Sequence, residues 1–246
     1  MINPRLSILT ATFNAGKHLP GLIESLKNQT DQDFEWIVAD GGSTDDTLSV
    51  IERLCKDMKY LSVDSRSDYG IYDALNRAIK KSTGDYYLVA GADDQFEPKA
   101  VENFKKGISC SDAELVSARI KVNGKVKRER KPSWLWLYGA SAKVSSHAVG
   151  TAIRTKLHSE FGFYSKKYQI YADGHFMLRV IKSGAKVELM DFVSGSYSTE
   201  GVSNRNQMIS FSEQFRSQIE NGSSWFLQLI VFSLRISKWG FKGALK

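Results

Sequence analysis

The segment GDYYLVAGADDQF (residues 84–96) decides the fold, because a short apolar run in it leads to a glycine and two adjacent carboxylates. The run YYLV predicts a buried strand, and Asp93 and Asp94 follow shortly after it. Neighbouring carboxylates repel each other, so such a pair indicates a bound cation, a sugar hydroxyl or an acidic turn in water. The other strand ends of the chain help to choose among these.

Three earlier segments repeat the pattern of a strand that ends in polar residues. RLSILTATF (5–13), FEWIVAD (34–40) and YLSVDS (60–65) predict strands, and helical spacing of apolar residues follows each one. Strands that alternate with helices imply right-handed crossovers and an α/β fold with a mostly parallel sheet. Such sheets bind ligands at the carboxyl ends of their strands. Here those ends carry Thr12–Asn14, Asp40, Ser65–Asp68 and Asp93–Asp94.

The second half of the chain is less regular. Asn123-Gly124 between alternating apolar residues indicates a hairpin turn, and DGHFMLRVIKSG (173–184) indicates a helix with a glycine stop. Two further helices are predicted over residues 207–220 and 224–239. One domain with a C-terminal extension is the simplest division. In the first half, Ser43 is the predicted N-cap of the helix after the second strand.

The composition is that of a folded, basic protein. The 246 residues are 42% hydrophobic with a formal net charge of +7, which is enough apolar material for a sizeable core. Two cysteines far apart fit no metal or redox spacing and indicate a reducing compartment. The start MINPRLSIL shows no secretory signal, and no apolar run approaches the roughly 20 residues that span a bilayer. We therefore expect a cytoplasmic protein.

Positive charge is concentrated in two segments. RIKVNGKVKRERK (119–131) contains one acid, Glu129, and the tail from Arg235 to Lys246 contains none. Clusters of this kind favour an anionic partner, which is nucleic acid, a phosphorylated substrate or an acidic membrane surface. A solvated basic face is the alternative for the first segment.

The tail is also apolar in its first part. WFLQLIVFSL (225–234) precedes the basic residues, which suits an amphipathic helix lying in an anionic interface on the inner face of the membrane. A helix that docks on the core of the domain is the alternative. SWLWLY (133–138) adds a second aromatic contact or lines an acceptor cleft.

The strand-end acids favour a metal site on an otherwise basic protein. Adjacent aspartates supply hard oxygen ligands, which suit Mg²⁺ or Mn²⁺ when phosphate oxygens complete the coordination. A metal bound in this way neutralises a diphosphate leaving group. Other site classes lack their motifs, since the first turn TATFNAGKH (10–18) has neither G-x-G-x-x-G spacing nor a P-loop. G-x-S-x-G and H-E-x-x-H do not occur.

Two long segments carry a resemblance to a known family. The first, LSILTATFNAGKHLPGLIESLKNQTDQDFEWIVADGGSTDDT (6–47), resembles the opening of a family-2 inverting glycosyltransferase of the GT-A fold. The second, RSDYGIYDALNRAIKKSTGDYYLVAGADDQF (66–96), resembles its continuation through the metal-binding acidic motif. The resemblance implies a mostly parallel sheet flanked by helices, in a domain over residues 1–205. Residues 1–98 would form the Rossmann-like, nucleotide-sugar-binding half and residues 99–205 the acceptor side. A helical extension would cover 206–246.

The same resemblance implies roles for the strand-end residues. The donor would be a nucleotide-diphosphate sugar, with a UDP-sugar expected, and the cofactor Mn²⁺ or Mg²⁺. Asp73 has an alternative role, because an acid in the first turn of a helix is stabilised by the helix dipole. The implied contacts are Thr12 and Asn14 near the nucleotide, Asp40 on the base or ribose, Asp68 and Asp73 lining the donor pocket, Asp93 on the ribose or sugar, and Asp94 on the metal.

An inverting transfer needs a general base for the acceptor hydroxyl. The family usually places this base in a Glu-Asp pair at the start of a helix, and this sequence offers Ala172-Asp173. Asp173 is therefore the predicted base without the preceding glutamate, and a plain N-cap is its alternative role. His147 is predicted to face the acceptor or the diphosphate, with a structural hydrogen bond as the alternative.

The predicted function is the transfer of a single sugar, because the Q-x-x-R-W motif of processive synthases is absent. The resemblance favours a glycan or a polyprenyl-diphosphate-linked glycan as acceptor. Nucleic acid is not expected as a partner, since the strand-end carboxylates would repel a polyanion. Two alternatives remain from the sequence. One is a sugar-nucleotide nucleotidyltransferase, and the other is a non-enzymatic basic module that binds glycan or nucleic acid.

Overall fold

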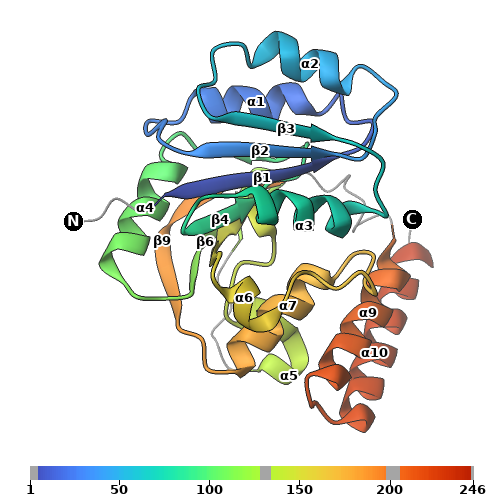
Figure 1. The fold of residues 1–246 in the computed structure, drawn as a ribbon. Helices are drawn as coiled ribbons and strands as arrows, with labels where there is room; N and C mark the ends of the chain where they lie inside the picture. Colours follow the sequence, from blue (N-terminus) through green and yellow to red (C-terminus); the bar gives the residue numbers. More distant parts are fainter. Residues whose placement is uncertain (1–4, 128–133, 198–205, 245–246) are drawn as a thin grey trace.

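The computed structural model describes residues 5–127, 134–197 and 206–244, and it shows one sheet with helices packed on both faces (Figure 1). The strand order is β3-β2-β1-β4-β8-β6-β9-β5, with β7 paired to β6. Helices alternate with strands through the first half, so the predicted α/β class is confirmed.

Four parallel strands form the first half of the sheet. Their register pairs Thr12 with Asp40 and Asp40 with Ser65. The polar carboxyl ends of these three strands therefore meet at one edge, as predicted. The strands are β1 (Leu6–Thr12), β2 (Glu35–Asp40), β3 (Leu61–Ser65) and β4 (Tyr86–Val89), joined by α1 (Leu19–Lys27), α2 (Thr47–Leu54) and α3 (Ile71–Lys81).

Beyond β4 the sheet is mixed. β8 pairs antiparallel with β4 and β6, whereas β9 runs parallel to β6. Asn123 and Gly124 have φ angles of 49° and 74° and turn β6 back into β7, which confirms the predicted hairpin. The strands are β5 (Gln95–Phe96), β6 (Leu115–Val122), β7 (Lys125–Val126), β8 (Thr151–Arg154) and β9 (Val187–Tyr197). The helices are α4 (Ala100–Cys110), α5 (Leu135–Tyr138), α6 (Leu157–Phe161) and α7 (Ala172–Lys182).

Apolar side chains cover both faces of the sheet. Ile8 and Trp36 belong to the core shared with α1 and α4, while Leu9 and Ile37 belong to the core shared with α3 and α7. Neighbouring residues of a strand point to opposite faces. The strands are apolar on both faces because each face is covered, and each such side chain contributes about 1.5–3 kcal/mol by burial.

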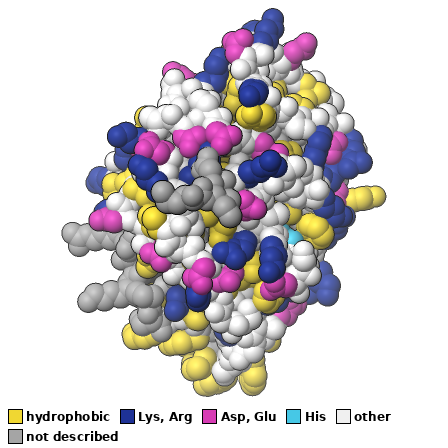
Figure 2. Space-filling view, turned by 60° about the vertical axis from the view of Figure 1, so that its left-hand side comes forward, with side chains coloured by type: hydrophobic (Ala, Val, Ile, Leu, Met, Phe, Trp, Pro, Cys, Tyr) yellow, Lys and Arg dark blue, Asp and Glu magenta, His cyan; other side chains and the backbone are white. Residues whose placement is uncertain are grey.

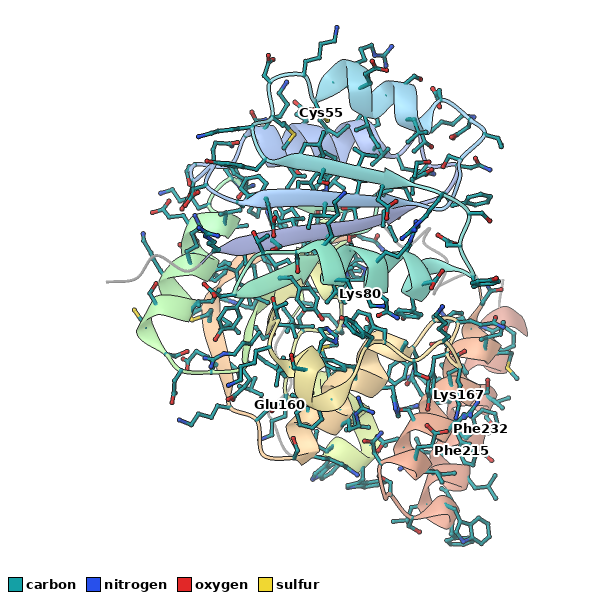
Figure 3. The ribbon with its side chains drawn as sticks, viewed as in Figure 1. Cys55, Lys80, Glu160, Lys167, Phe215 and Phe232 are labelled. Carbon is teal, nitrogen blue, oxygen red and sulfur yellow. The ribbon has the colours of Figure 1, made fainter. Side chains whose placement is uncertain are left out.

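The C-terminal extension is a helical hairpin. Helix α9 (Gln207–Glu220) and helix α10 (Trp225–Ala244) confirm the two predicted helices. Phe215 and Phe232 join them, with ring centroids 5.4 Å apart (Figure 3). In Figure 1 the hairpin stands on the side toward which the arrowheads of β2 and β3 point. The predicted division after residue 205 stays a prediction, because residues 198–205 lie outside the described residues.

The start of α2 differs from the prediction that Ser43 is its N-cap. The helix begins at Thr47, and the Ser43 hydroxyl instead donates to Asp40 Oδ1 at 2.5 Å. Asp45 Oδ1 accepts from the Thr47 backbone N–H at 3.0 Å. The prediction is wrong because Asp46 occupies the N-cap position, and Ser43, three residues before it, is bonded to the charged carboxylate of Asp40 instead.

The surface does not separate charge by sign over the face shown in Figure 2, where basic and acidic side chains are interspersed. Residues 128–131 of the basic segment lie outside the described part of the chain. Within the described ranges, no helix has the length and hydropathy needed to cross a membrane.

Candidate functional site

Asp40 lies at the centre of the polar strand ends. It is fully buried, and its carboxylate accepts five hydrogen bonds from within the protein. Burial raises the pKa of Asp40, but the hydrogen bonds from Ser43, Ser65 and Thr12 outweigh it and bring the pKa below its usual value. Asp40 is therefore a fixed anion. Its donors are Thr12 Oγ1 (3.0 Å), Ser43 Oγ (2.5 Å), Ser65 Oγ (2.7 Å) and the N–H groups of Gly42 (3.0 Å) and Ser43 (2.9 Å).

Asn14 connects the loops that follow β1 and β2. Its backbone N–H donates to Ser43 Oγ at 2.8 Å, and its side-chain Oδ1 accepts from the Thr44 N–H at 2.9 Å. The φ of 50° at Asn14 is a left-handed conformation that asparagine tolerates. The structure thus brings Thr12, Asn14 and Asp40 together as predicted.

Asp68 reaches the same group from the loop after β3. A Cβ at Gly41 would lie 2.8 Å from Asp68 Oδ2, so the glycine allows this close approach. Asp68 Oδ1 accepts from the Gly70 N–H at 2.8 Å, and Oδ2 lies 3.5 Å from Arg77 Nη2. Glycine is favoured at position 70 because its φ is +110°.

Arg77 is a residue of this group that the sequence reasoning missed. Its Nη2 donates to the Asp40 carbonyl oxygen at 3.0 Å, and its Nη1 lies 3.5 Å from Asp64 Oδ2. Within the described structure, buried Nε and Nη1 have no hydrogen-bond partner. A basic residue inside an amphipathic helix gave no signal that it would turn toward the strand ends.

Asp73 lies in the first turn of α3. It accepts from Lys166 Nζ at 2.6 Å and from the Tyr69 N–H at 3.3 Å. The hydrogen bond from Lys166 is the main reason that the pKa of Asp73 lies below its usual value. These contacts fit the alternative role as a helix first-turn acid, and a role in lining the donor pocket stays a prediction.

Asp93 and Asp94 fold back over Gly91. A Cβ at Gly91 would lie 3.0 Å from Asp93 Oδ1 and 3.2 Å from Asp94 Oδ2, so a larger residue would crowd both carboxylates. Asp94 is only 1% exposed and accepts from the Gly91 N–H at 2.7 Å. Burial, with a smaller contribution from the charge of Asp93, raises the pKa of Asp94 well above its usual value. Asp93 is half-buried.

His147 lies beside Asp94, with Nδ1 3.7 Å from Asp94 Oδ2. Its ring stacks on Tyr197 at a centroid distance of 4.2 Å. Burial lowers the pKa of His147 to about 4, so the imidazole is neutral at pH 7. In the described parts of the chain, Asp94 has no lysine or arginine ion pair.

The surroundings of Asp94 suit a divalent cation whose remaining ligands are phosphate oxygens. A buried carboxylate beside a neutral imidazole has no positive charge to balance it, and both groups are metal ligands. Across residues 5–127, 134–197 and 206–244, no group of three or more His, Cys, Asp or Glu side chains could hold a metal. Mg²⁺ needs no such cage, because one or two carboxylates with substrate phosphates are its usual ligands.

Asp173 lies in the first turn of α7 and is half-buried. Tyr72 Oη lies 2.9 Å from Asp173 Oδ1 and 2.5 Å from the Ile170 carbonyl oxygen, and it can donate to either. The Gly174 N–H also donates to Oδ1, at 2.8 Å. Burial raises the pKa of Asp173, and the hydrogen bond from Tyr72 opposes it. The N-cap alternative is wrong, because Tyr171 occupies that position.

Glu213 of α9 holds the turn before α7, and the sequence reasoning also missed it. Its buried carboxylate accepts from three consecutive backbone N–H groups, those of Gln169 (2.6 Å), Ile170 (2.9 Å) and Tyr171 (2.9 Å). The N–H groups before and in the first turn of a helix have no intrahelical partners. An acid from the extension thus fixes the segment that leads into Asp173.

The described hydrogen bonds and ion pairs therefore collect the predicted residues into three groups. The first is Thr12, Asn14, Asp40 and Asp68, and the second is Asp94 with His147 beside Asp93. The third is centred on the start of α3, where Tyr72 contacts Asp173 and Asp73 contacts Lys166.

The chain is similar in sequence to known proteins. The model of the family described as Glycosyl transferase family 2 matches residues 7–179. A PGL/p-HBAD biosynthesis glycosyltransferase from Mycobacterium bovis (strain BCG / Pasteur 1173P2) is 28% identical over 208 residues, which are 82% of this chain and 79% of that protein.

Solved structures share the GT-A fold. S. aureus TarS 1–349 in complex with UDP-GlcNAc gives a TM-score of 0.73 at 17% identity, covering 94% of this chain and 71% of that one. The mannosyltransferase PcManGT from Pyrobaculum calidifontis, in complex with GDP-Man and Mn²⁺, gives a TM-score of 0.67 at 17% identity over 97% and 75% of the two chains. The family model matches well over half of the residues of this chain, and the chain therefore belongs to glycosyl transferase family 2.

Proposed function

We propose that this protein transfers a single sugar from a UDP-sugar to a hydroxyl of a lipid-linked glycan, with inversion at the anomeric carbon. Family membership establishes the glycosyltransferase class and decides against the two alternatives left open by the sequence. The complexes of TarS with UDP-GlcNAc and of PcManGT with GDP-Man support a nucleotide-sugar donor here. UDP is our choice between the two nucleotides.

The observation that carries the proposal is the setting of Asp173. Its carboxylate is half-buried at the start of α7, and burial raises its pKa toward the range in which a carboxylate accepts a proton well. Tyr72, which contacts it, belongs to the helix that follows the β3 strand end. Asp173 is thus linked to the edge where the donor residues gather.

In the proposed reaction, Asp173 accepts the proton of the acceptor hydroxyl. The hydroxyl oxygen forms a bond to the anomeric carbon from the face opposite the leaving group. The bond from that carbon to the diphosphate oxygen breaks, and the nucleoside diphosphate leaves with the electron pair. One bond forms as one breaks on the opposite face, which inverts the configuration.

Asp94 is the residue that would hold the divalent metal, with His147 beside it. When bound, Mn²⁺ or Mg²⁺ neutralises charge on the departing diphosphate. The buried, uncompensated carboxylate of Asp94 supports this assignment, and the Mn²⁺ in the PcManGT complex supports it by analogy.

The donor would lie along the remaining strand-end residues. Asn14 is exposed and Asp93 half-buried, so both have surface to offer to a nucleotide and its ribose or sugar. Thr12 and Asp40 are buried and bonded to each other, and we assign them to holding the loops that contact the base and ribose. Asp68 and Asp73 would line the donor pocket from the start of α3.

The experiment is a panel of UDP-, GDP- and dTDP-sugars with polyprenyl-diphosphate-linked glycan acceptors, run with Mn²⁺ and with chelator. We expect release of UDP only when metal is present, and a product whose anomeric configuration is opposite to that of the donor by NMR. Retained configuration would contradict inversion, and full turnover in chelator would contradict the metal. Asp57→Asn, an exposed acid after α2, is the control variant and should keep the wild-type rate.

A further inference from the structure

Helix α10 is held to the protein by two polar side chains as well as by Val231 and Phe232, and it leaves many apolar side chains exposed. Gln228 is 2% exposed and donates to the Trp136 carbonyl oxygen at 2.6 Å. Arg235 donates to Gln214 Oε1 at 2.8 Å and to the Leu137 carbonyl oxygen at 2.7 Å. Gln228 and Arg235 are two helical turns apart, so they lie on the same side of α10, which faces α5 and α9. The hydrogen bonds, rather than apolar packing alone, attach α10 to the domain.

Between Trp225 and Trp239, large apolar side chains are exposed beside the exposed polar residues Ser233, Ser237 and Lys238. Trp225 is 64% exposed and Leu234 is 65% exposed. A helix that meets water shows the opposite pattern, with its apolar side on the core. The alternative of a docked helix holds for one side of α10, where Val231 is buried and Phe232 packs on Phe215, but docking does not account for the apolar side chains that stay exposed. The exposed apolar residues of α10 are Trp225, Phe226, Leu227, Leu229, Ile230, Leu234 and Trp239.

Helix α5 adds to this apolar surface. Trp134 and Trp136 are large exposed residues, and their rings stack on each other at 6.3 Å. The hydrogen bond from Gln228 to Trp136 places the two helices side by side. Figure 2 shows hydrophobic side chains gathered at the lower end of the molecule, the end at which α5 and the α9–α10 turn lie in Figure 1. We call the seven exposed apolar residues of α10, together with Trp136 of α5 and Trp134 directly before it, the apolar surface.

Charge and aromatic placement identify what covers the apolar surface. By sequence, α10 contains no acid, and Lys238 and Lys242 lie in its second half, beyond the inward-bonded Arg235. Two copies packed face to face would bring like charges together, whereas anionic headgroups would neutralise them. Trp225 and Trp239 lie fourteen residues apart near the two ends of the helix, about 21 Å along its axis. Tryptophan favours the boundary between headgroups and acyl chains.

We propose that the apolar surface lies in the interface of an anionic lipid bilayer, with α10 parallel to the membrane plane. The bilayer surface is the one partner proposed for the apolar surface. The proposal is independent of the transfer chemistry, although a lipid-linked acceptor would be reached from the same surface. Because α9 packs on α10 and carries Glu213, the membrane contact lies one helix away from the turn that leads into Asp173.

The test is flotation of the full-length protein with vesicles of phosphatidylglycerol or of phosphatidylcholine. We expect binding to the anionic vesicles and weaker binding to the neutral ones. The difference should disappear in 1 M salt, because the Debye length is then only about 3 Å and the charges are screened. Trp225→Glu and Leu234→Glu should each lower the apparent affinity for anionic vesicles by about tenfold or more. Both side chains are largely exposed, so folding should be unaffected, which circular dichroism checks.

Leu48→Glu, an exposed leucine on α2, is the matched control and should bind vesicles as the wild type does. Protein that stays with the soluble fraction in the presence of anionic vesicles would overturn the proposal. Sedimentation provides a second test. A concentration-dependent dimer that Leu234→Glu breaks would show that a second copy, and not lipid, covers the apolar surface.

Discussion

Asp40 and Asp173 are both buried or half-buried carboxylates, yet their surroundings shift their proton affinities in opposite directions. Asp40 accepts five hydrogen bonds, and its pKa lies below the usual value. Asp173 accepts from Tyr72 and Gly174 on one oxygen, and burial leaves its pKa raised. Burial disfavours the charged form in both cases. The hydrogen bonds outweigh burial at Asp40, whereas at Asp173 burial, together with the charge of Glu213, outweighs them.

The difference separates a structural anion from a proton acceptor. A carboxylate saturated by donors stays ionised and holds its neighbours in place, which suits Asp40 and the three loops it joins. A carboxylate with fewer donors and a raised pKa can take a proton at moderate pH, which suits a general base. Exchanging or removing single partners tests whether this distinction is real.

The largest effect is expected for Asp173→Asn, which keeps the shape of the side chain and removes its basicity. Transfer should fall by about 10²–10⁴-fold, the usual contribution of a general base. The affinity for the nucleoside diphosphate with metal, measured by calorimetry, should stay within about twofold because Asp173 does not belong to the donor group. Transfer within tenfold of the wild type would assign the base to another residue.

The next effect is on stability, for Asp40→Asn. Loss of charged hydrogen bonds in a buried setting should lower the free energy of unfolding by about 1.5–3 kcal/mol at pH 7, measured by urea denaturation. The folded pKa of Asp40 is lowered, so its contribution is present above the unfolded pKa and is lost as the pH falls through the folded pKa. The gap between wild type and variant should therefore narrow in acid. A gap independent of pH would contradict this assignment.

Glu213→Gln tests whether the extension positions the base. A neutral amide cannot replace the carboxylate that accepts from three N–H groups, so the turn before α7 should loosen. We expect kcat to fall by about tenfold, or about 1.4 kcal/mol of transition-state stabilisation, with the donor KM unchanged. Glu213→Asp should restore part of the rate. Equal loss in both variants, or a change confined to KM, would mean that Glu213 acts only on overall folding.

Tyr72→Phe should have the smallest effect on the rate, a reduction of a few-fold, because Gly174 still donates to Asp173. The hydrogen bond from Tyr72 lowers the pKa of Asp173. Without it, the acidic limb of the pH–rate profile should move to higher pH. An unmoved limb would show that Tyr72 donates to the Ile170 carbonyl instead.

The sequence predicted the donor side of the molecule well because its signals are local. Each strand and the polar group at its end are contiguous, so β1 to β4 and the meeting of Thr12, Asn14 and Asp40 could be predicted from the pattern and the strand register. Ser43 was assigned wrongly because a rule for helix caps does not consider the carboxylate of Asp40, three residues earlier, which accepts the Ser43 hydroxyl hydrogen bond, while the helix starts later, at Thr47.

The acceptor side could be predicted only in part, because its contacts join distant residues. Asp173 was predicted from the family resemblance, but its partner Tyr72 lies 101 positions away along the chain. Glu213 is on a helix whose pattern predicts only that it is a helix. Arg77 was missed for the same reason. The exposure of apolar side chains on α10 depends on how the helix packs in three dimensions. Its sequence is equally consistent with a helix that docks on the core.

The pH dependence of kcat at saturating metal and donor tests the central claim most directly. If Asp173 is the base, the wild-type rate falls in acid with a midpoint above 3.8, the usual value for an aspartate, and the residual rate of Asp173→Asn lacks that limb. An acidic limb of the same midpoint in Asp173→Asn would show that another group takes the proton, and the account of Asp173 would be wrong.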